Sequence, residues 1–144
     1  MITASWHPPH IPWALPEPFY SMYDRNDMEV DMSEVDKIHP IMKNSTAAKL
    51  GRLLGEEGVR EYLAIYRAQV HYIDQQVGRV IKALKESGQY ENTLIIFTSD
   101  HGDIQGRFGS VGKTMSGFYN ELVRIPLIVK PPFSENTTFR NDDH

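Results

Sequence analysis

Three polar side chains that could act on a charged ester follow the most clearly buried run of the sequence. Asp100 and His101 follow the apolar, β-branched run 93–98 after a single serine, and Lys113 stands in the glycine-punctuated stretch beyond them. Ligands of open α/β sheets bind beyond the carboxyl ends of the strands. A carboxylate and an imidazole there can both face one divalent cation, and a loop ammonium can meet an oxyanion. The alternative is that Asp100 caps a turn while His101 and Lys113 are solvated loop residues.

A histidine on stiff backbone is a further candidate. His10 lies between prolines 8, 9 and 12, and each proline restricts the residue before it. Its ring could therefore donate to an oxyanion or a leaving group without moving. His7 is an alternative for the same task, and a turn histidine without a role is the structural alternative. Asp103 could orient His101 or belong to a turn, and we favour the turn.

The elements that would position these residues follow from the apolar pattern. Spacings of three and four from Val59 to Leu84 predict a long helix, which Gly88 would terminate. The runs 94–98 and 125–129 predict strands of one sheet with the helix on its face, and Met1–Trp6 predicts a further short strand. A helix followed by a buried strand is typical of an α/β architecture, with strands that are mixed or mostly parallel. We expect Glu121 and Arg124 to be structural, as an ion pair beside the last strand.

Composition restricts the classes of function. The chain has 144 residues, 15 Lys plus Arg against 19 Asp plus Glu, and no cysteine. Because positive and negative residues are interspersed, the sequence shows no basic patch of the kind that binds nucleic acid. The absence of cysteine excludes disulfides and thiolate chemistry. Its apolar runs are far shorter than the ~20 residues that span a bilayer, and no targeting segment is visible. We therefore expect a soluble protein with no nucleic-acid or membrane partner, and its compartment stays open.

Several segments, in order, resemble the sulfatase family of the alkaline-phosphatase-like superfamily. Segment 9–12 resembles the Pro-His-x-Pro segment of that family, and the helix around 73–79 resembles the helix before its metal-binding strand. Segment 92–103 is similar to the strand that runs into Ser-Asp-His-Gly or Ser-Asp-Asn-Gly. Segments 112–113 and 119–129 resemble the loop lysine and the strand reached through an Arg-hydrophobic-Pro-Leu sequence.

The resemblance implies a fold, a reaction and a role for each candidate. The fold would be part of a three-layer α/β sandwich, with a mixed, mostly parallel sheet flanked by helices. Asp100 would be a metal ligand and His101 a ligand or neighbour of the metal, which would be Ca²⁺, or else Mn²⁺ or Mg²⁺. Lys113 would bind the oxygens of a small sulfate ester, and His10 would lie beside the sulfate or its leaving oxygen. Charge on the transferred group would thus be stabilised during in-line displacement.

The chain also departs from the family pattern. The family nucleophile is a formylglycine made in a Cys- or Ser-x-Pro-x-Arg motif, and no such motif occurs here. The early strand with the acidic pair that completes the metal site is likewise missing. The resemblance therefore implies that residues 1–133 are the C-terminal portion of a sulfatase-type catalytic domain and that 134–144 is a polar tail or linker. We expect the isolated chain to be inactive and to self-associate through an uncovered sheet edge.

Two other functions remain open. A histidine at position 101, where many sulfatases have asparagine, also occurs in relatives that cleave phosphonate monoesters or phosphate diesters. The parent enzyme could therefore act on phosphorus esters, although sulfate is favoured. A different class of function is a non-catalytic interaction module that keeps the edge of the sheet without turnover.

Overall fold

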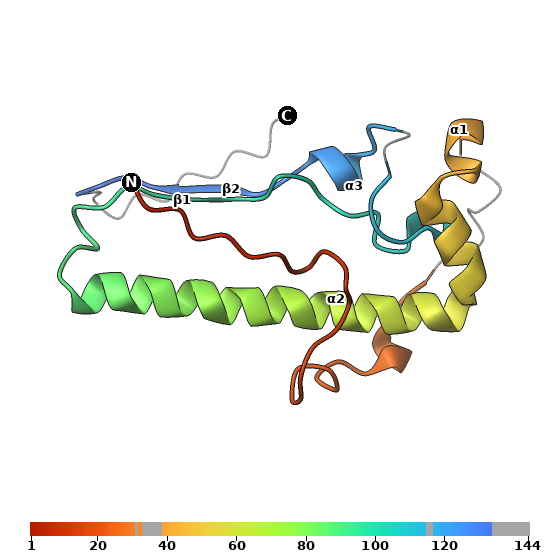
Figure 1. Ribbon diagram of the computed structural model, residues 1–144, viewed down its shortest axis with the longest axis horizontal. Helices are drawn as coiled ribbons and strands as arrows, with labels where there is room; N and C mark the ends of the chain where they lie inside the picture. The colour runs from red at the N-terminus through yellow and green to blue at the C-terminus, as the bar shows by residue number, and fades with distance from the viewer. Residues whose placement is uncertain (31, 33–38, 115–116, 134–144) are drawn as a thin grey trace.

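The fold is organised along one long helix. The computed structural model describes residues 1–30, 32, 39–114 and 117–133, so the predicted tail 134–144 lies outside the described part. Helix α2 spans Thr46–Glu86, and the other elements lie along it or at one of its ends (Figure 1). Ser45 caps its start by accepting the Ala48 amide at 3.1 Å. Gly88, with φ of 71°, follows its last turn as predicted, since a left-handed residue commonly ends a helix.

Helix α2 begins well before the predicted start at Val59. The segment 46–58 contains three glycines, which have low helix propensity and hide the periodic pattern. Gly55 is not helical, with φ of 64° and ψ of -175°, and the helix bends there (Figure 1). Its first part runs towards α1, which spans Pro40–Lys43, so tertiary packing overrides local propensity.

The predicted strands pair with each other in one sheet, as expected. Strand β1 spans Ile95–Thr98 and strand β2 spans Leu127–Lys130, and they are antiparallel, with Ile95 opposite Lys130 and Thr98 opposite Leu127. The sheet expected from the sequence is mixed and mostly parallel, whereas the described residues contain this one antiparallel pair and no parallel pair. An apolar run indicates burial on both faces but carries no information about strand direction.

A further expectation about the sheet is wrong, because Met1–Trp6 is exposed and forms no strand. Helix α2 runs alongside the sheet (Figure 1), and Ile95 and Phe97 of β1 are half-buried whereas Ile96 is 57% exposed. The backbone of α2 comes nearest to the 3₁₀ turns η1 (Arg25–Asp27) and η3 (Arg107–Gly109) and to helix α1. The sheet also exposes apolar side chains of β2, including Ile128 at 62%. An isolated pair of strands is at best marginally stable, so this apolar sheet calls for further cover.

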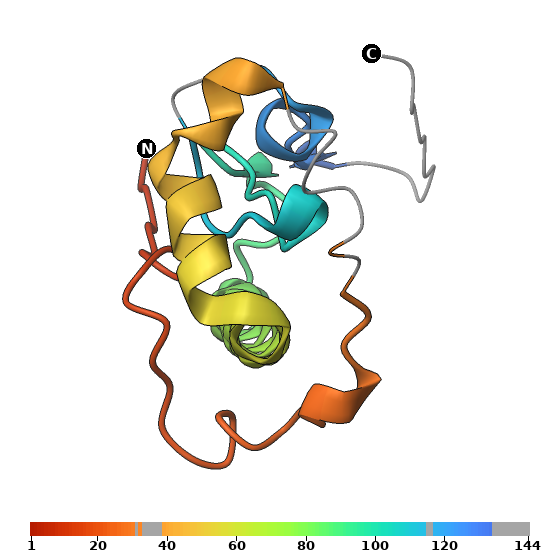
Figure 2. The same ribbon diagram turned by 90° about the vertical axis from the view of Figure 1, so that its right-hand side faces the viewer.

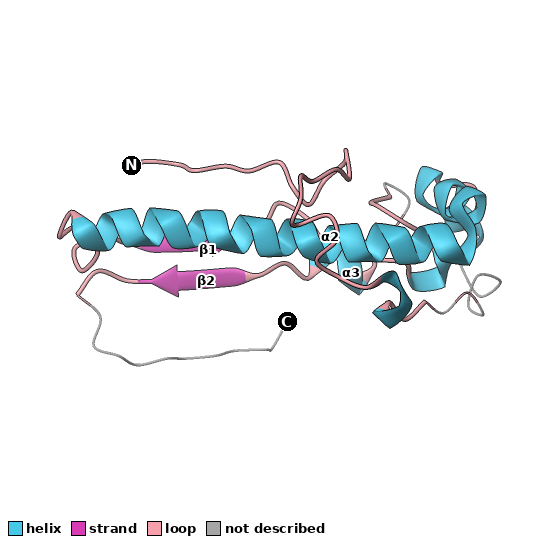
Figure 3. Cartoon of the chain, turned by 90° about the horizontal axis from the view of Figure 1, so that it is seen from below, coloured by secondary structure: helices cyan, strands magenta, loops and turns pink. Residues whose placement is uncertain are grey.

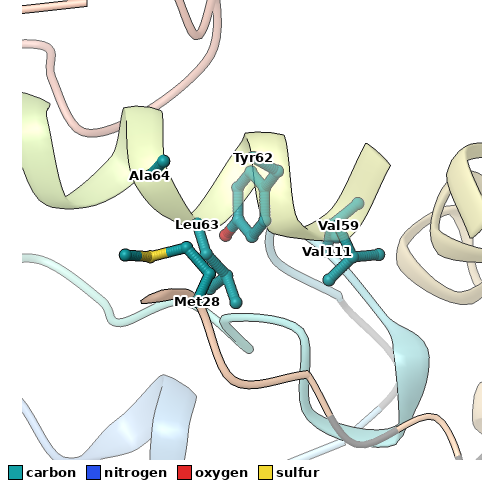
Figure 4. Close-up of a cluster of buried hydrophobic side chains, with 6 residues drawn as sticks. All are labelled: Met28, Val59, Tyr62, Leu63, Ala64 and Val111. Carbon is teal, nitrogen blue, oxygen red and sulfur yellow. The ribbon is translucent and has the colours of Figure 1, made fainter. Parts of the chain in front are cut away.

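The core sits at the other end of α2, in two clusters. The first contains Met28, Val59, Tyr62, Leu63, Ala64 and Val111 (Figure 4). The second contains Met42, Ala47, Ala48, Ile104 and Leu122. Figure 2 looks onto this end and shows α1, the start of α2, η3 and α3 (Asn120–Val123) gathered together.

The core holds the loop that follows β1. Ile104 lies in one cluster and Val111 in the other, so both ends of the segment 104–111 are buried against helices. The Val111 amide also donates to the Ala47 carbonyl at 3.2 Å. Figure 3, seen from below, shows this loop region and α3 between the sheet and the bent end of α2. No helix of the described residues is long and apolar enough to cross a membrane.

Candidate active site

The predicted site residues meet around the ring of His101. The Lys113 ammonium lies 3.2 Å from His101 Nε2, and the Asp100 carboxylate lies 3.8 Å from the same nitrogen. The His10 ring lies edge-on to the His101 ring, with 6.1 Å between centroids. Residues from the start of the chain, from the end of β1 and from the following loop thus share one locality. Such proximity is what a site acting on one small ester needs.

The backbone fixes the tautomer of His101. Its Nδ1 lies 2.7 Å from the Gly102 carbonyl oxygen, which can only accept, so Nδ1 carries the proton. In the neutral ring Nε2 then has a free lone pair, and the Lys113 ammonium donates to it. Ser99 braces the same residue, because its hydroxyl donates to the His101 carbonyl at 2.7 Å. His101 is therefore held with its Nε2 lone pair available to a cation, here the Lys113 ammonium.

Asp100 is largely open to solvent, with 87% of its side chain exposed. One carboxylate oxygen accepts the His101 amide at 3.0 Å, which is the turn-capping role of the structural alternative. Its slight burial would raise the pKa of the Asp100 carboxyl, but His101, the backbone amides of residues 100 and 101, and Lys113 together lower it. Asp100 therefore caps the turn and still presents an ionised, accessible carboxylate.

His10 shares the arrangement found at His101. Its Nδ1 donates to the Ile11 carbonyl at 3.1 Å, so Nε2 is the atom that can exchange a proton with a ligand. His7 lies beside it, with 4.8 Å between ring centroids, and accepts the His10 amide at its carbonyl oxygen. The two rings contact each other, and the His10 ring is the one in contact with His101. The structure thus places His10, rather than His7, next to His101.

Close backbone contact holds the turn after β1. The Gly102 amide donates to the Leu122 carbonyl at 2.8 Å, which ties the turn to α3. A Cβ at Gly102 would lie 1.9 Å from the Glu121 carbonyl oxygen, so only glycine fits. Glu121 itself pairs with Arg107 rather than with Arg124, which corrects the ion pair expected from sequence. Its partner comes from the η3 turn, a proximity that sequence spacing did not indicate.

Sequence reasoning missed the residues beneath this site. The spacing of Tyr62 within the apolar stripe predicts core packing, and Tyr62 is buried, but its hydroxyl also donates to Asp103. Asp103 accepts the Gln105 amide at 2.9 Å, so it is a turn residue as favoured, and Nδ1 of His101 pairs with Gly102 instead. Gln69, also buried, donates to the Pro12 carbonyl at 3.1 Å. A polar residue inside an apolar helical stripe was the available signal for Gln69.

Two neighbouring side chains could donate to a metal in the part of the chain that the structure describes. Asp100 offers an exposed carboxylate and His101 offers an imidazole nitrogen, whereas no group of three or more His, Cys, Asp or Glu side chains is placed to hold an ion there. An oxygen donor beside a nitrogen donor fits a divalent cation chemically. A complete coordination shell would need ligands beyond these two.

Comparison with known proteins decides the family. The sulfatase family model matches residues 1–143. The chain belongs to the sulfatase family. Its resemblance to that family and to the alkaline-phosphatase-like superfamily is therefore confirmed.

Relatives of this sulfatase-family chain include both sulfatases and phosphorus-ester hydrolases. The multifunctional alkaline phosphatase superfamily protein PehA of Trinickia caryophylli is 34% identical over 141 residues, which cover 87% of this chain and 27% of PehA. The choline-sulfatase of Rhizobium meliloti is 31% identical, covering 91% of this chain and 26% of that enzyme. The solved phosphonate monoester hydrolase of Silicibacter pomeroyi is 33% identical with a TM-score of 0.71, covering 86% of this chain and 27% of that protein.

These neighbours support an alkaline-phosphatase-like α/β fold for the segment. The chain spans about a quarter of the length of the relatives it matches. It therefore corresponds to one part of each relative.

Proposed function

We propose that this chain supplies the cation-binding and oxyanion-binding part of a sulfatase-type ester hydrolase site. The observation that carries the proposal is the convergence of Lys113, Asp100 and His10 on the His101 ring. The family match makes the parent protein a hydrolase of sulfate or related esters in this proposal. The nucleophile, a formylglycine, would come from a segment that this sequence does not contain.

Each residue has a task that its environment permits. Lys113 binds the non-bridging oxygens of the sulfate group, because an ammonium stabilises the charge that develops on them. His10 serves the leaving oxygen, since its Nε2 can carry a proton while Nδ1 stays bound to the Ile11 carbonyl. Asp100 keeps its negative charge and thereby balances the cations around it. None of these tasks needs the site residues to change their backbone contacts.

Asp100 and His101 would hold a divalent cation, for which Ca²⁺ is the first candidate and Mn²⁺ or Mg²⁺ the others. When bound, such a cation supplies Lewis-acid stabilisation of the ester oxygens. The lone pair of His101 Nε2 accepts from the Lys113 ammonium and can serve one cation at a time. If a divalent cation were held by His101, the Lys113 ammonium would be available for the substrate oxygens. Affinity for the metal should be weak in the chain alone, because two donors do not neutralise a dication.

Hydrolysis of a phosphonate monoester or phosphate diester is the second candidate. It is favoured by His101 and by the similarity to PehA and to the solved phosphonate monoester hydrolase, each at least 33% identical. The same cationic cluster can bind either a sulfuryl or a phosphoryl group, so the cluster alone does not separate the two.

The test joins this segment to a nucleophile-bearing sulfatase segment and compares kcat/KM for an aryl sulfate and an aryl phosphonate monoester. Faster sulfate hydrolysis supports the first candidate, and faster phosphonate hydrolysis supports the second. His101→Asn should raise the ratio of sulfate to phosphonate turnover. Hydrolysis of either ester that is unaffected by Lys113→Ala and by His10→Ala would refute both candidates, whereas the exposed Lys49→Ala serves as the control for loss of a lysine.

A further inference from the structure

We propose that Tyr62 is a positioning residue whose hydroxyl fixes the distance between the Asp100–His101 turn and the Lys113 loop. The Tyr62 hydroxyl donates to Asp103 and accepts the Gly112 amide at 3.4 Å. Asp103 lies two residues beyond His101, and Gly112 immediately precedes Lys113. One buried oxygen atom therefore joins the two segments that carry the metal-binding and sulfate-binding residues of the proposed function, on which this inference rests.

The ring of Tyr62 also contacts the segment that carries His10. Trp13 packs edge-on against Tyr62, with 4.7 Å between ring centroids, and Gln69 on the same helix holds the Pro12 carbonyl. Tyr62 and Gln69 are exposed by 2% and 1%, and each acts from inside the packed core. Side chains there adopt single rotamers because the interior is close-packed. Helix α2 thus provides one rigid reference for all three segments of the site.

The chemistry of the phenol suits this task. Burial, followed by the negative charge of Asp103, raises the pKa of the Tyr62 hydroxyl. The hydroxyl therefore stays protonated, donates its hydrogen to the carboxylate and keeps its lone pairs for the Gly112 amide. Hydrogen bonds to a charged acceptor are stronger than neutral ones, so the contact with Asp103 is the firmer of the two. Removing the hydroxyl should free both segments together.

If Tyr62 served only in packing, removing its hydroxyl would leave the two segments in place. Tyr62→Phe therefore distinguishes a packing role from a positioning role, because it removes the hydroxyl and keeps the ring. Tyr72→Phe is the matched control, since Tyr72 lies on the same helix with its ring against Phe19, 5.3 Å between centroids. We measure amide hydrogen exchange at Gly112 and the ring nitrogen signals of His101 by NMR on the 144-residue chain. Neither measurement depends on turnover, so a failure of the proposed function leaves this test intact.

Tyr62→Phe should speed exchange of the Gly112 amide by about fivefold, the effect of one ordinary hydrogen bond. It should also shift the His101 Nε2 signal, because Lys113 no longer keeps its place beside that nitrogen. Tyr72→Phe should do neither. Equal Gly112 exchange and equal His101 signals in the two variants would overturn the proposal.

Two further measurements cover the remaining outcomes. Circular dichroism shows whether Tyr62→Phe folds. If it does not fold, Asp103→Ala removes the acceptor of the same hydrogen bond and should give the same shift of the His101 signal. An unchanged His101 signal in Asp103→Ala would overturn the proposal.

Inorganic sulfate is the binding probe. Its affinity should fall about fivefold in Tyr62→Phe, and Asp103→Ala should add little further loss in that background, because both substitutions remove the same hydrogen bond. Fully additive losses would contradict a positioning role.

Discussion

Replacing Gly102 with alanine tests how strictly the site depends on the close contact between the turn after β1 and α3. The added Cβ would lie 1.9 Å from the Glu121 carbonyl oxygen, whereas ordinary contact begins at 3.4 Å. The two segments must therefore separate by about 1.5 Å, since both contacting groups are backbone. The hydrogen bond from the Gly102 amide to the Leu122 carbonyl, now 2.8 Å, cannot survive that separation.

The expected cost follows from these two effects. Overpacking of this kind costs about 1–3 kcal/mol, and the lost hydrogen bond about 1 kcal/mol more. We therefore expect Gly102→Ala to lower the free energy of unfolding by about 2–4 kcal/mol. In an active protein, displacement of the neighbouring His101 by about 1 Å should lower kcat/KM by about 10²-fold.

Urea denaturation followed by circular dichroism measures this change. Gly78→Ala is the control, because an alanine Cβ there meets no atom within 4 Å and the position lies within helix α2. That variant should gain about 0.5–1 kcal/mol, as alanine is the better helix former. A loss below about 0.5 kcal/mol in Gly102→Ala, together with unchanged His101 NMR signals, would refute the argument from close contact.

Three other predictions concern charge and activity. In an active form, Lys113→Ala should lower kcat/KM for a charged ester by about 10²- to 10³-fold through loss of one oxyanion donor, and an unchanged rate would exclude Lys113 from the site. Arg25 lowers the pKa of the Glu61 carboxyl by hydrogen bonding to it. The stability that this pair contributes should therefore be complete above the unfolded pKa near 4.5 and should be lost as the pH falls through the lower folded pKa. If the melting temperature of Glu61→Gln followed that of the wild type at every pH, this prediction would be contradicted. The 144-residue chain alone should hydrolyse no aryl sulfate with Ca²⁺ or Mn²⁺ added, and turnover abolished by Asp100→Ala would show this wrong.

The local elements near the site could be predicted from the sequence because their signals are local. The run 94–98 is apolar and β-branched, and the spacing of apolar residues from Val59 to Leu84 is helical, so each element was assigned to the correct type. Gly88 follows the helix as a left-handed residue, which its position after the last periodic residue indicated. The grouping of Lys113 with His101 was expected because both follow the same strand.

Strand direction, long-range pairing and the start of α2 could not be predicted, for physical reasons. The direction of β2 relative to β1 depends on the path of the chain between them, which no apolar pattern records. The first part of α2 contains Gly51, whose Cβ would lie 1.8 Å from the Gly109 carbonyl oxygen, so glycine serves close packing there at the expense of helix propensity. Tyr62 has the spacing of a core residue, and its hydroxyl contacts depend on loops distant in sequence.

The most direct test of the central claim is an NMR titration of the chain with inorganic sulfate in the presence of Ca²⁺. If His10, His101 and Lys113 form one anion-binding site, their side-chain signals should shift together and fit a single Kd. Lys113→Ala should abolish the shifts at both histidines, whereas Lys49→Ala should leave them unchanged. Shifts at Lys113 without any shift at His10, or shifts at the histidines that persist in Lys113→Ala, would contradict the claim that these residues act on one ligand.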